Sequence, residues 1–139
     1  MTKKLLLLVL LSVWMLGTAV AGELAIVANK SVKASEISAD DLRDVFNGRK
    51  ANLSDGTRVT PVTLKQGAAH AAFLRDLAGK NDAAFRATWR SLVFSGQAAM
   101  PKAFDSEAAL LDYVAATPGT IGYVSKGTQN DGVKHLAVK

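Results

Sequence analysis

Hydrophobic runs and polar breaks divide most of the chain into alternating β-prone and helical segments. A nearly continuous apolar run at residues 23–31 predicts a strand buried on both faces, and residues 58–64 predict a second strand after an Asp-Gly turn. Pro61 lacks an amide hydrogen, so the second strand should lie at a sheet edge or contain a bulge. Residues 121–124 and 133–138 predict two final strands that run antiparallel to each other.

Apolar side chains recur at helical spacing in four segments between these strands. The clearest helix follows Ser38 as its N-cap, buries Leu42, Val45 and Phe46, and stops at Gly48. Three further helices are predicted, over residues 67–79, 81–96 and 105–119. The alternation of strands and helices therefore predicts an α/β fold.

The helix predicted at 81–96 carries large apolar residues at helical spacing. Phe85, Trp89, Leu92 and Val93 are expected to face inward, and Phe46 should join Phe85 and Trp89 in the core. Because a helix between two strands returns the chain to the same edge, the first strands should be parallel. The expected fold is a mixed, mostly parallel sheet flanked by helices, in one domain.

The first 21 residues have the pattern of a secretory signal. Lys3 and Lys4 precede an apolar run at residues 5–16, and small residues follow at 19–21. We expect cleavage after Ala21, which gives a signal peptide at 1–21 and an α/β domain at 22–139. The apolar run is short for a bilayer, so no membrane span is expected after cleavage, and the protein should reside in the periplasm.

Composition excludes several classes of protein. The chain has no cysteine, so it can hold neither disulfides nor a thiolate metal site, and no cofactor is expected. After removal of the leader, 15 basic and 12 acidic residues leave a net charge of +3. The basic residues are spread singly among acidic ones, which argues against nucleic-acid binding but suits a small anionic ligand.

Catalytic motifs are absent from the sequence. There is no nucleophile elbow, zinc-protease motif, phosphate loop or dinucleotide fingerprint. His70 and His135 lie far apart in the sequence and have no obvious carboxylate partner. We therefore expect a protein that is not an enzyme, and a hydrolase that uses one of these histidines is the most distant alternative.

Polar residues follow three of the predicted strands. In open α/β sheets, ligands bind beyond the carboxyl ends of parallel strands, where helix N-termini offer unpaired N–H groups. Small donors and lysines there suit an oxyanion, provided that the three loops converge. The candidate ligand-binding residues are Asn29, Lys30, Ser31, Lys65, Gln66, Gly67, Ser125 and Lys126.

Two motifs resemble a known family. The helix ending in "VFNGR" and the segment "PGTIGYV" are similar to those of type II periplasmic phosphate-binding proteins of ABC transporters, and closest to their short PBP-like relatives. The likeness covers residues 24–124 and implies a single lobe of that fold. Full-length members have two lobes, and "TLKQGAAHAAF" stands where they carry an Arg and an Asp-Gly-Ser-Gly-Thr phosphate loop. No ligand residue is therefore carried over from the family.

The resemblance and the residues together predict a secreted solute-binding-like domain of the phosphate ABC transporter substrate-binding type. It would bind phosphate or another oxyanion weakly and take part in transport with a membrane permease. The alternative is a periplasmic accessory or sensory domain that has lost its ligand. Such a domain would present an exposed apolar face to a sensor protein, another partner or a second copy of itself.

Overall fold

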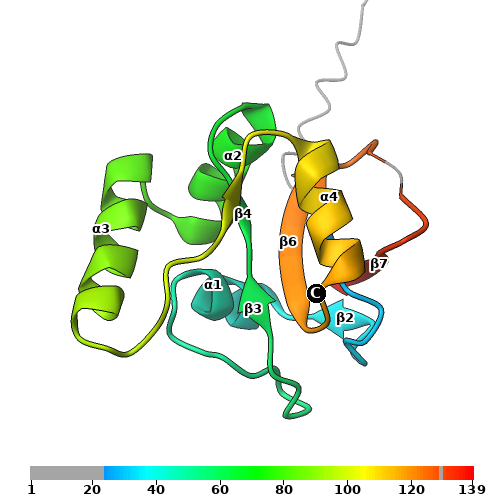
Figure 1. The fold of residues 1–139 in the computed structure, drawn as a ribbon, viewed down its shortest axis with the longest axis horizontal. Coiled ribbons are helices and arrows are strands. Elements are labelled where there is room, and N and C mark those ends of the chain that lie inside the picture. The colour runs from blue at the N-terminus through cyan, green and yellow to red at the C-terminus, as the bar shows by residue number, and fades with distance from the viewer. Residues whose placement is uncertain (1–23, 129) are drawn as a thin grey trace, which may run out of the picture.

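The computed structural model describes residues 24–128 and 130–139, so the predicted signal peptide at 1–21 lies outside the described residues. A five-stranded sheet with the order β2-β7-β1-β6-β3 forms the centre of the fold (Figure 1). Its strands are β1 (Leu24–Ala28), β2 (Glu36–Ile37), β3 (Thr60–Pro61), β6 (Thr120–Ser125) and β7 (Lys134–Val138). A separate parallel pair consists of β4 (Thr63–Leu64) and β5 (Ala103–Phe104). As predicted for Pro61, β3 lies at a sheet edge.

The directions of the strands confirm the mixed, mostly parallel sheet but correct two details. β1 pairs antiparallel with both β6 and β7, whereas β2 is parallel to β7 and β3 is parallel to β6. The expectation that the first strand is parallel to the second is therefore wrong. The expectation that the last two strands are antiparallel is also wrong, because β1 lies between them and opposes both.

The short strand β2 explains the error at the start of the chain. It has two residues, too few to show any periodicity, and it directly precedes α1 (Ala39–Phe46). The strand-helix-strand rule therefore applies to β2, α1 and β3, which do run in the same direction. β1 is outside that unit.

All four predicted helices are present. They are α1, α2 (Ala68–Phe73), α3 (Asp82–Phe94) and α4 (Glu107–Ala116), and a π-helical turn, η2 (Leu74–Ala78), continues α2. Ser38, Asn81 and Ser106 cap α1, α3 and α4 by accepting a hydrogen bond from the amide three residues on. Across residues 24–128 and 130–139, no helix combines the length and apolarity needed to cross a membrane.

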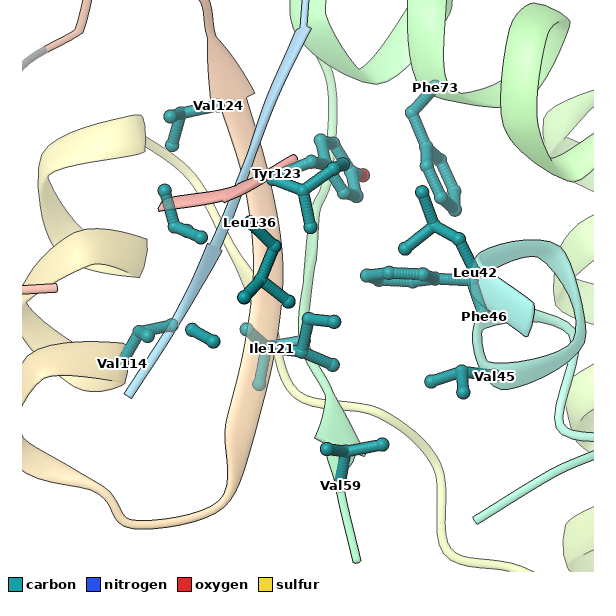
Figure 2. Packing of buried hydrophobic residues seen from close by; sticks show 14 of the residues in the cluster. Leu42, Val45, Phe46, Val59, Phe73, Val114, Ile121, Tyr123, Val124 and Leu136 are labelled. Carbon is teal, nitrogen blue, oxygen red and sulfur yellow. The ribbon is translucent and has the colours of Figure 1, made fainter. Parts of the chain in front are cut away.

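The helices cover the sheet on both faces. α4 packs on one face of β6 and β1, while α1 and α2 lie on the other, which makes three layers (Figure 1). Figure 2 shows Val124 on the α4 side and Tyr123 directed toward Phe73 and Phe46. The Tyr123 and Phe73 rings stack with centroids 4.2 Å apart, and Phe46 meets both edge-on. β6 is thus a central strand with apolar packing on each side.

The end of α3 departs from the predicted core. Phe85 and Trp89 are buried, as is Phe46 on α1, so these three predictions are confirmed. Val93 was expected to face inward, but 41% of it is exposed, and its neighbour Phe94 is 96% exposed. α3 lies beside η2 and the end of α1 and not on the sheet, so one face of its last turn packs through Leu92 next to Gly48, while Val93 and Phe94 face away from the core.

Candidate functional site

The predicted ligand residues fall in three loops: residues 29–31 after β1, 65–67 after β4, and 125–126 at the end of β6. The first of these loops lies at the opposite end of the sheet from the third. In the antiparallel pairing of β1 with β6, Ala28 lies opposite Ile121 at the start of β6, whereas Leu24 lies opposite Ser125 at its end. Lys30 therefore follows β1 at one end of the sheet, and Lys126 follows β6 at the other. The three loops do not converge, because β1 runs against the other strands.

Asn29 and Ser31 have structural partners. The Asn29 amide donates hydrogen bonds to the carbonyl oxygens of Val114 (2.7 Å) and Ala115 (3.1 Å), near the C-terminus of α4. The Ser31 hydroxyl accepts one from the Gly119 amide at 2.9 Å. These side chains satisfy backbone groups where α4 ends and β6 begins. In the segment "TPGTIGYV", the helix can therefore stop abruptly because this loop supplies its missing hydrogen-bond partners.

The second and third loops do meet, around the start of α4. Gln66 and Gly67 line a small hollow together with Asp105 and Glu107. The Glu107 carboxylate in turn accepts hydrogen bonds from the Ser125 amide and from the Ser125 hydroxyl at 2.9 Å. The loops after β4 and β6, two strands that run the same way, therefore lie close together.

An internal carboxylate already uses the donors of the third loop. Glu107 also accepts from the Thr128 hydroxyl at 3.0 Å, so its two oxygens bind three donors of the segment after β6. An external anion in the hollow would face the charges of Glu107 and Asp105. Lys126 lines a different depression with Asp76 and His135. The hollow is therefore poorly suited to an oxyanion.

A more cationic groove lies between α3 and the β4–β5 pair. Its volume is about 330 Å³, which lies within the range of small-molecule sites. β4 and Lys65 line one side, α3 lines the other, and Met100, Pro101 and Ala103 also line the groove. The lining residues are Thr63, Leu64, Lys65, His70, Asp82, Phe85, Arg86, Trp89, Arg90, Met100, Pro101 and Ala103.

The groove carries an excess of positive charge. Lys65, Arg86 and Arg90 face a single carboxylate, that of Asp82, so the charged lining sums to +2 with His70 neutral. Arg86 binds Asp82 at 2.9 Å, and Lys65 lies 3.5 Å from the Asp105 carboxylate. Among the described residues, Arg90 has no ion-pair or hydrogen-bond partner. One cation in the groove is therefore available to an external anion.

A chain of hydrogen bonds forms the base of the groove. The Tyr123 hydroxyl accepts a hydrogen bond from the Leu64 amide at 3.0 Å and lies 2.6 Å from Nδ1 of His70. In the tautomer with its proton on Nε2, His70 accepts a hydrogen bond from the Tyr123 hydroxyl at Nδ1 and donates one to the Asp82 carboxylate, which lies 3.0 Å from Nε2.

The network fixes the charge state of its members. The hydrogen bond from His70, with a further contribution from Arg86, holds the pKa of Asp82 below its ordinary value. Burial raises the pKa of Tyr123 well above its usual range, so the phenol stays neutral. The arrangement holds the ionised Asp82 carboxylate beside the His70 imidazole at the base of the groove.

Most residues of this groove were not predicted from the sequence. No carboxylate partner was expected for His70, but the structure shows that Asp82, twelve residues later, is its partner. The turn at Gly79 between η2 and α3 brings the two side chains together. Only Lys65 was among the predicted ligand residues. Arg86 and Arg90 follow Asp82 at spacings of four, beside the Phe85 and Trp89 row, and that periodic pattern could have located them.

No family model matches the sequence. Solved structures do resemble the fold. The chain aligns with a protein described as a phosphate ABC transporter substrate-binding protein from Clostridium perfringens, whose structure contains phosphate, at 16% identity and a TM-score of 0.65. The alignment covers 84% of this chain and 44% of that one. This chain shares its fold with part of the phosphate-transport binding proteins.

Two more structures give the same result. An ABC-type phosphate transport receptor from Vibrio cholerae matches at 16% identity and a TM-score of 0.55, and PstS from Borrelia burgdorferi at 13% and 0.58. Each alignment covers 84% of this chain but 46% and 47% of the other chain. The chain therefore spans less than half the length of these relatives. At this identity the likeness confirms the predicted PBP-like fold.

Proposed function

We propose that this protein is an exported, non-enzymatic solute-binding-like domain of the phosphate-binding type that binds a small anion in the groove between α3 and β4. The observation that carries the proposal is the unpaired Arg90 in a groove with an excess of cations. The fold supports it, because solved proteins that share it are described as phosphate-transport binding proteins. A mature chain of residues 22–139 would act in the periplasm.

Lys65 and Arg90 are the proposed anion contacts. Lys65 comes from the loop after β4, where the Gln66 amide donates to the Asp105 carbonyl oxygen just before α4 and Gly67 lines the neighbouring hollow, and Arg90 comes from the opposite side of the groove. Lys30 lies at the far end of the sheet, and the donors of Ser125 are engaged by Glu107. We therefore leave the first and third loops out of the proposed site.

Binding should be weak. About half of the Lys65 side chain is exposed, and the Asp82 carboxylate lies within the groove, so attraction to an anion is both screened and partly opposed. No second lobe closes over the groove within the described residues. Tight binding of a small ligand needs burial and preorganised donors. We expect phosphate affinity in the millimolar range.

Calorimetric titration of residues 22–139 with phosphate and with sulfate, at constant ionic strength, tests this proposal. Arg90→Gln and Lys65→Gln should each weaken binding about three- to fivefold, the range expected for an exposed ion pair. Lys30→Gln is the matched control and should leave affinity unchanged. An absence of heat and of thermal shift at millimolar anion would refute the proposal, as would equal weakening by Lys30→Gln.

Export can be tested separately by cell fractionation. The proposal expects the mature protein in the periplasmic fraction, with Gly22 as its first residue by N-terminal sequencing. Recovery of an uncleaved chain from the cytoplasm would contradict it. A permease would be the partner in transport.

The runner-up is an accessory or sensory interaction domain. One observation favours it: Phe94 is 96% exposed and Met100 50% exposed, on the end of α3 and the loop that follows. Sedimentation analysis of the wild type and of Phe94→Ser distinguishes the two. Self-association that Phe94→Ser abolishes would favour an interaction domain, and a monomer at all concentrations would count against self-association as its role.

A further inference from the structure

One side of the groove is built from two parallel rows of α3. Phe85 and Trp89 form an apolar row, and Asp82, Arg86 and Arg90 form a charged row beside it, each with a spacing of four residues. The apolar row is therefore flanked along its length by charged groups. Such a surface matches a ligand that is itself apolar over one part and charged at another.

The two aromatic side chains of α3 in the lining are largely buried, with Phe85 5% and Trp89 4% exposed, so each offers the groove only a small surface. The indole Nε1 of Trp89 already donates to the Phe46 carbonyl oxygen at 2.9 Å, so this ring has no polar group left to offer a ligand. Leu64 lines the groove from β4, and Met100 and Pro101 line it from the segment before β5. Half of Met100 is exposed, and a methionine side chain adapts readily to a bound ring.

Inorganic phosphate uses only part of such a surface. Phosphate has no apolar area, so it gains nothing from the apolar part of the lining. A ligand with an apolar body would cover the exposed apolar surface of the groove, above all Met100, and gain about 25 cal/mol for each Å² of apolar surface removed from water. Its charge would still meet Arg90.

We propose that the groove binds a small amphipathic carboxylate, with its apolar body against Met100 and Pro101, beside the largely buried Phe85 and Trp89, and its carboxylate at Arg90. This rests on the proposed anion-binding function and specifies its ligand class. A single negative charge is preferred over two because Arg86 and Lys65 already face the carboxylates of Asp82 and Asp105, which leaves the Arg90 side chain for the ligand. The three cations of the groove face one carboxylate, so charge complementarity selects an anion over a neutral apolar molecule.

Tryptophan fluorescence gives a direct reporter for this proposal. Trp89 is the one tryptophan in residues 22–139, since the other is Trp14. The probes are 3-phenylpropionate, its neutral analogue 3-phenylpropan-1-ol, and inorganic phosphate, with phosphate also followed by calorimetry at the same ionic strength. We expect 3-phenylpropionate to change the Trp89 emission and to bind at least about tenfold tighter than either of the others.

Three variants separate the contribution of the ligand's charge to its affinity from that of its apolar body. Arg90→Gln should weaken 3-phenylpropionate about three- to fivefold and leave the weak binding of the alcohol unchanged. Met100→Ser should weaken both aromatic probes. Arg58→Gln removes an exposed arginine outside the groove and should change none of the affinities. Circular dichroism of each variant checks that the fold is retained.

The results of these titrations distinguish the proposed ligand class from the proposed anion-binding function. If phosphate binds as tightly as 3-phenylpropionate and responds to Arg90→Gln, the amphipathic ligand class is wrong while the anion-binding function stands. If the alcohol binds as well as the carboxylate, the role of Arg90 is wrong. If neither anion binds, both proposals fail together.

Discussion

The hydroxyl oxygen of Tyr123 lies 2.6 Å from Nδ1 of His70 and also accepts a hydrogen bond from the amide of Leu64. One phenol therefore connects the central strand β6 with α2 and β4. Through His70, the same contact orients Asp82 at the base of the groove. Stability of the core and the shape of the groove thus depend on a shared set of hydrogen bonds.

Removing that hydroxyl should destabilise the protein. Tyr123→Phe leaves both the Leu64 amide and Nδ1 of His70 without a partner in a buried place, and an unsatisfied buried polar group costs about 1–3 kcal/mol. Urea unfolding measures the loss. Tyr113→Phe is the control, because that tyrosine is only half-buried and packs against Phe104. Equal stability of Tyr123→Phe and the wild type would show that the network contributes nothing.

Asp82 should make the free energy of unfolding depend on pH in the acidic range. Its pKa is lowered in the folded protein, first by the hydrogen bond from His70 and then by Arg86. The Asp82 carboxylate therefore binds a proton less readily in the folded state than in the unfolded state. Its contribution to the free energy of unfolding is complete above the pKa that Asp82 has in the unfolded state, and it is lost as the pH falls through the pKa of the folded state.

The measurement compares wild type with Asp82→Asn across pH. The wild type should be the more stable near pH 7, and the difference should shrink as the pH is lowered below about 4. Asn retains an oxygen that can accept from His70, so the fold should survive. Asp41 and Asp55 also have lowered pKa values, but both proteins contain them, and they cancel in the difference. A difference that stayed constant down to pH 2 would contradict the assignment.

The two neighbours Asn29 and Lys30 should behave in opposite ways. Asn29→Ala removes the donor to the Val114 and Ala115 carbonyl oxygens, and we expect a loss of about 1–3 kcal/mol in the free energy of unfolding. Lys30→Ala removes an exposed side chain and should change it by less than about 0.5 kcal/mol. Thermal denaturation of both variants tests this. Similar losses for the pair would disprove the capping role of Asn29.

Gly48 should tolerate no side chain. Its φ of +76° is in the left-handed region, and an added Cβ would lie 2.3 Å from Cδ1 of Leu92. Gly79 has a similar φ of +67°, but an added Cβ there meets nothing within 4 Å. Gly79→Ala should therefore lower the free energy of unfolding by about 1–2 kcal/mol through backbone strain alone, and Gly48→Ala should lower it by more.

The excess destabilisation of Gly48→Ala over Gly79→Ala measures how closely α3 packs on α1. Because Trp89 lies next to Gly48, a displaced α3 should also shift the Trp89 fluorescence. Equal effects of the two variants in unfolding experiments would mean that Leu92 moves aside freely.

Local signals in the sequence were sufficient for the helices. The Ser38 cap and the glycine stop at Gly48 depend only on residues close in the chain, and both are observed. Strand direction was not predictable in the same way, since the deciding strand β2 is two residues long. A pattern of two residues cannot be distinguished from a loop.

The candidate site was hard to predict for a different reason. The groove joins Thr63, His70, Asp82 and Met100, which come from separate elements, and pairings of that kind depend on the tertiary fold. Of the residues that the strand-exit rule selected, Lys65 lines the groove because it directly follows β4. Lys30 lies at the other end of the sheet because β1 runs against β6.

Anion binding in the groove is tested most directly by a map of backbone amide and indole chemical shifts in residues 22–139 during titration with phosphate. We expect the largest changes at Lys65, at Arg86 and Arg90 on α3, and at the indole of Trp89. Changes concentrated at residues 29–31 or 125–128, with the groove unaffected, would show that the anion does not bind there.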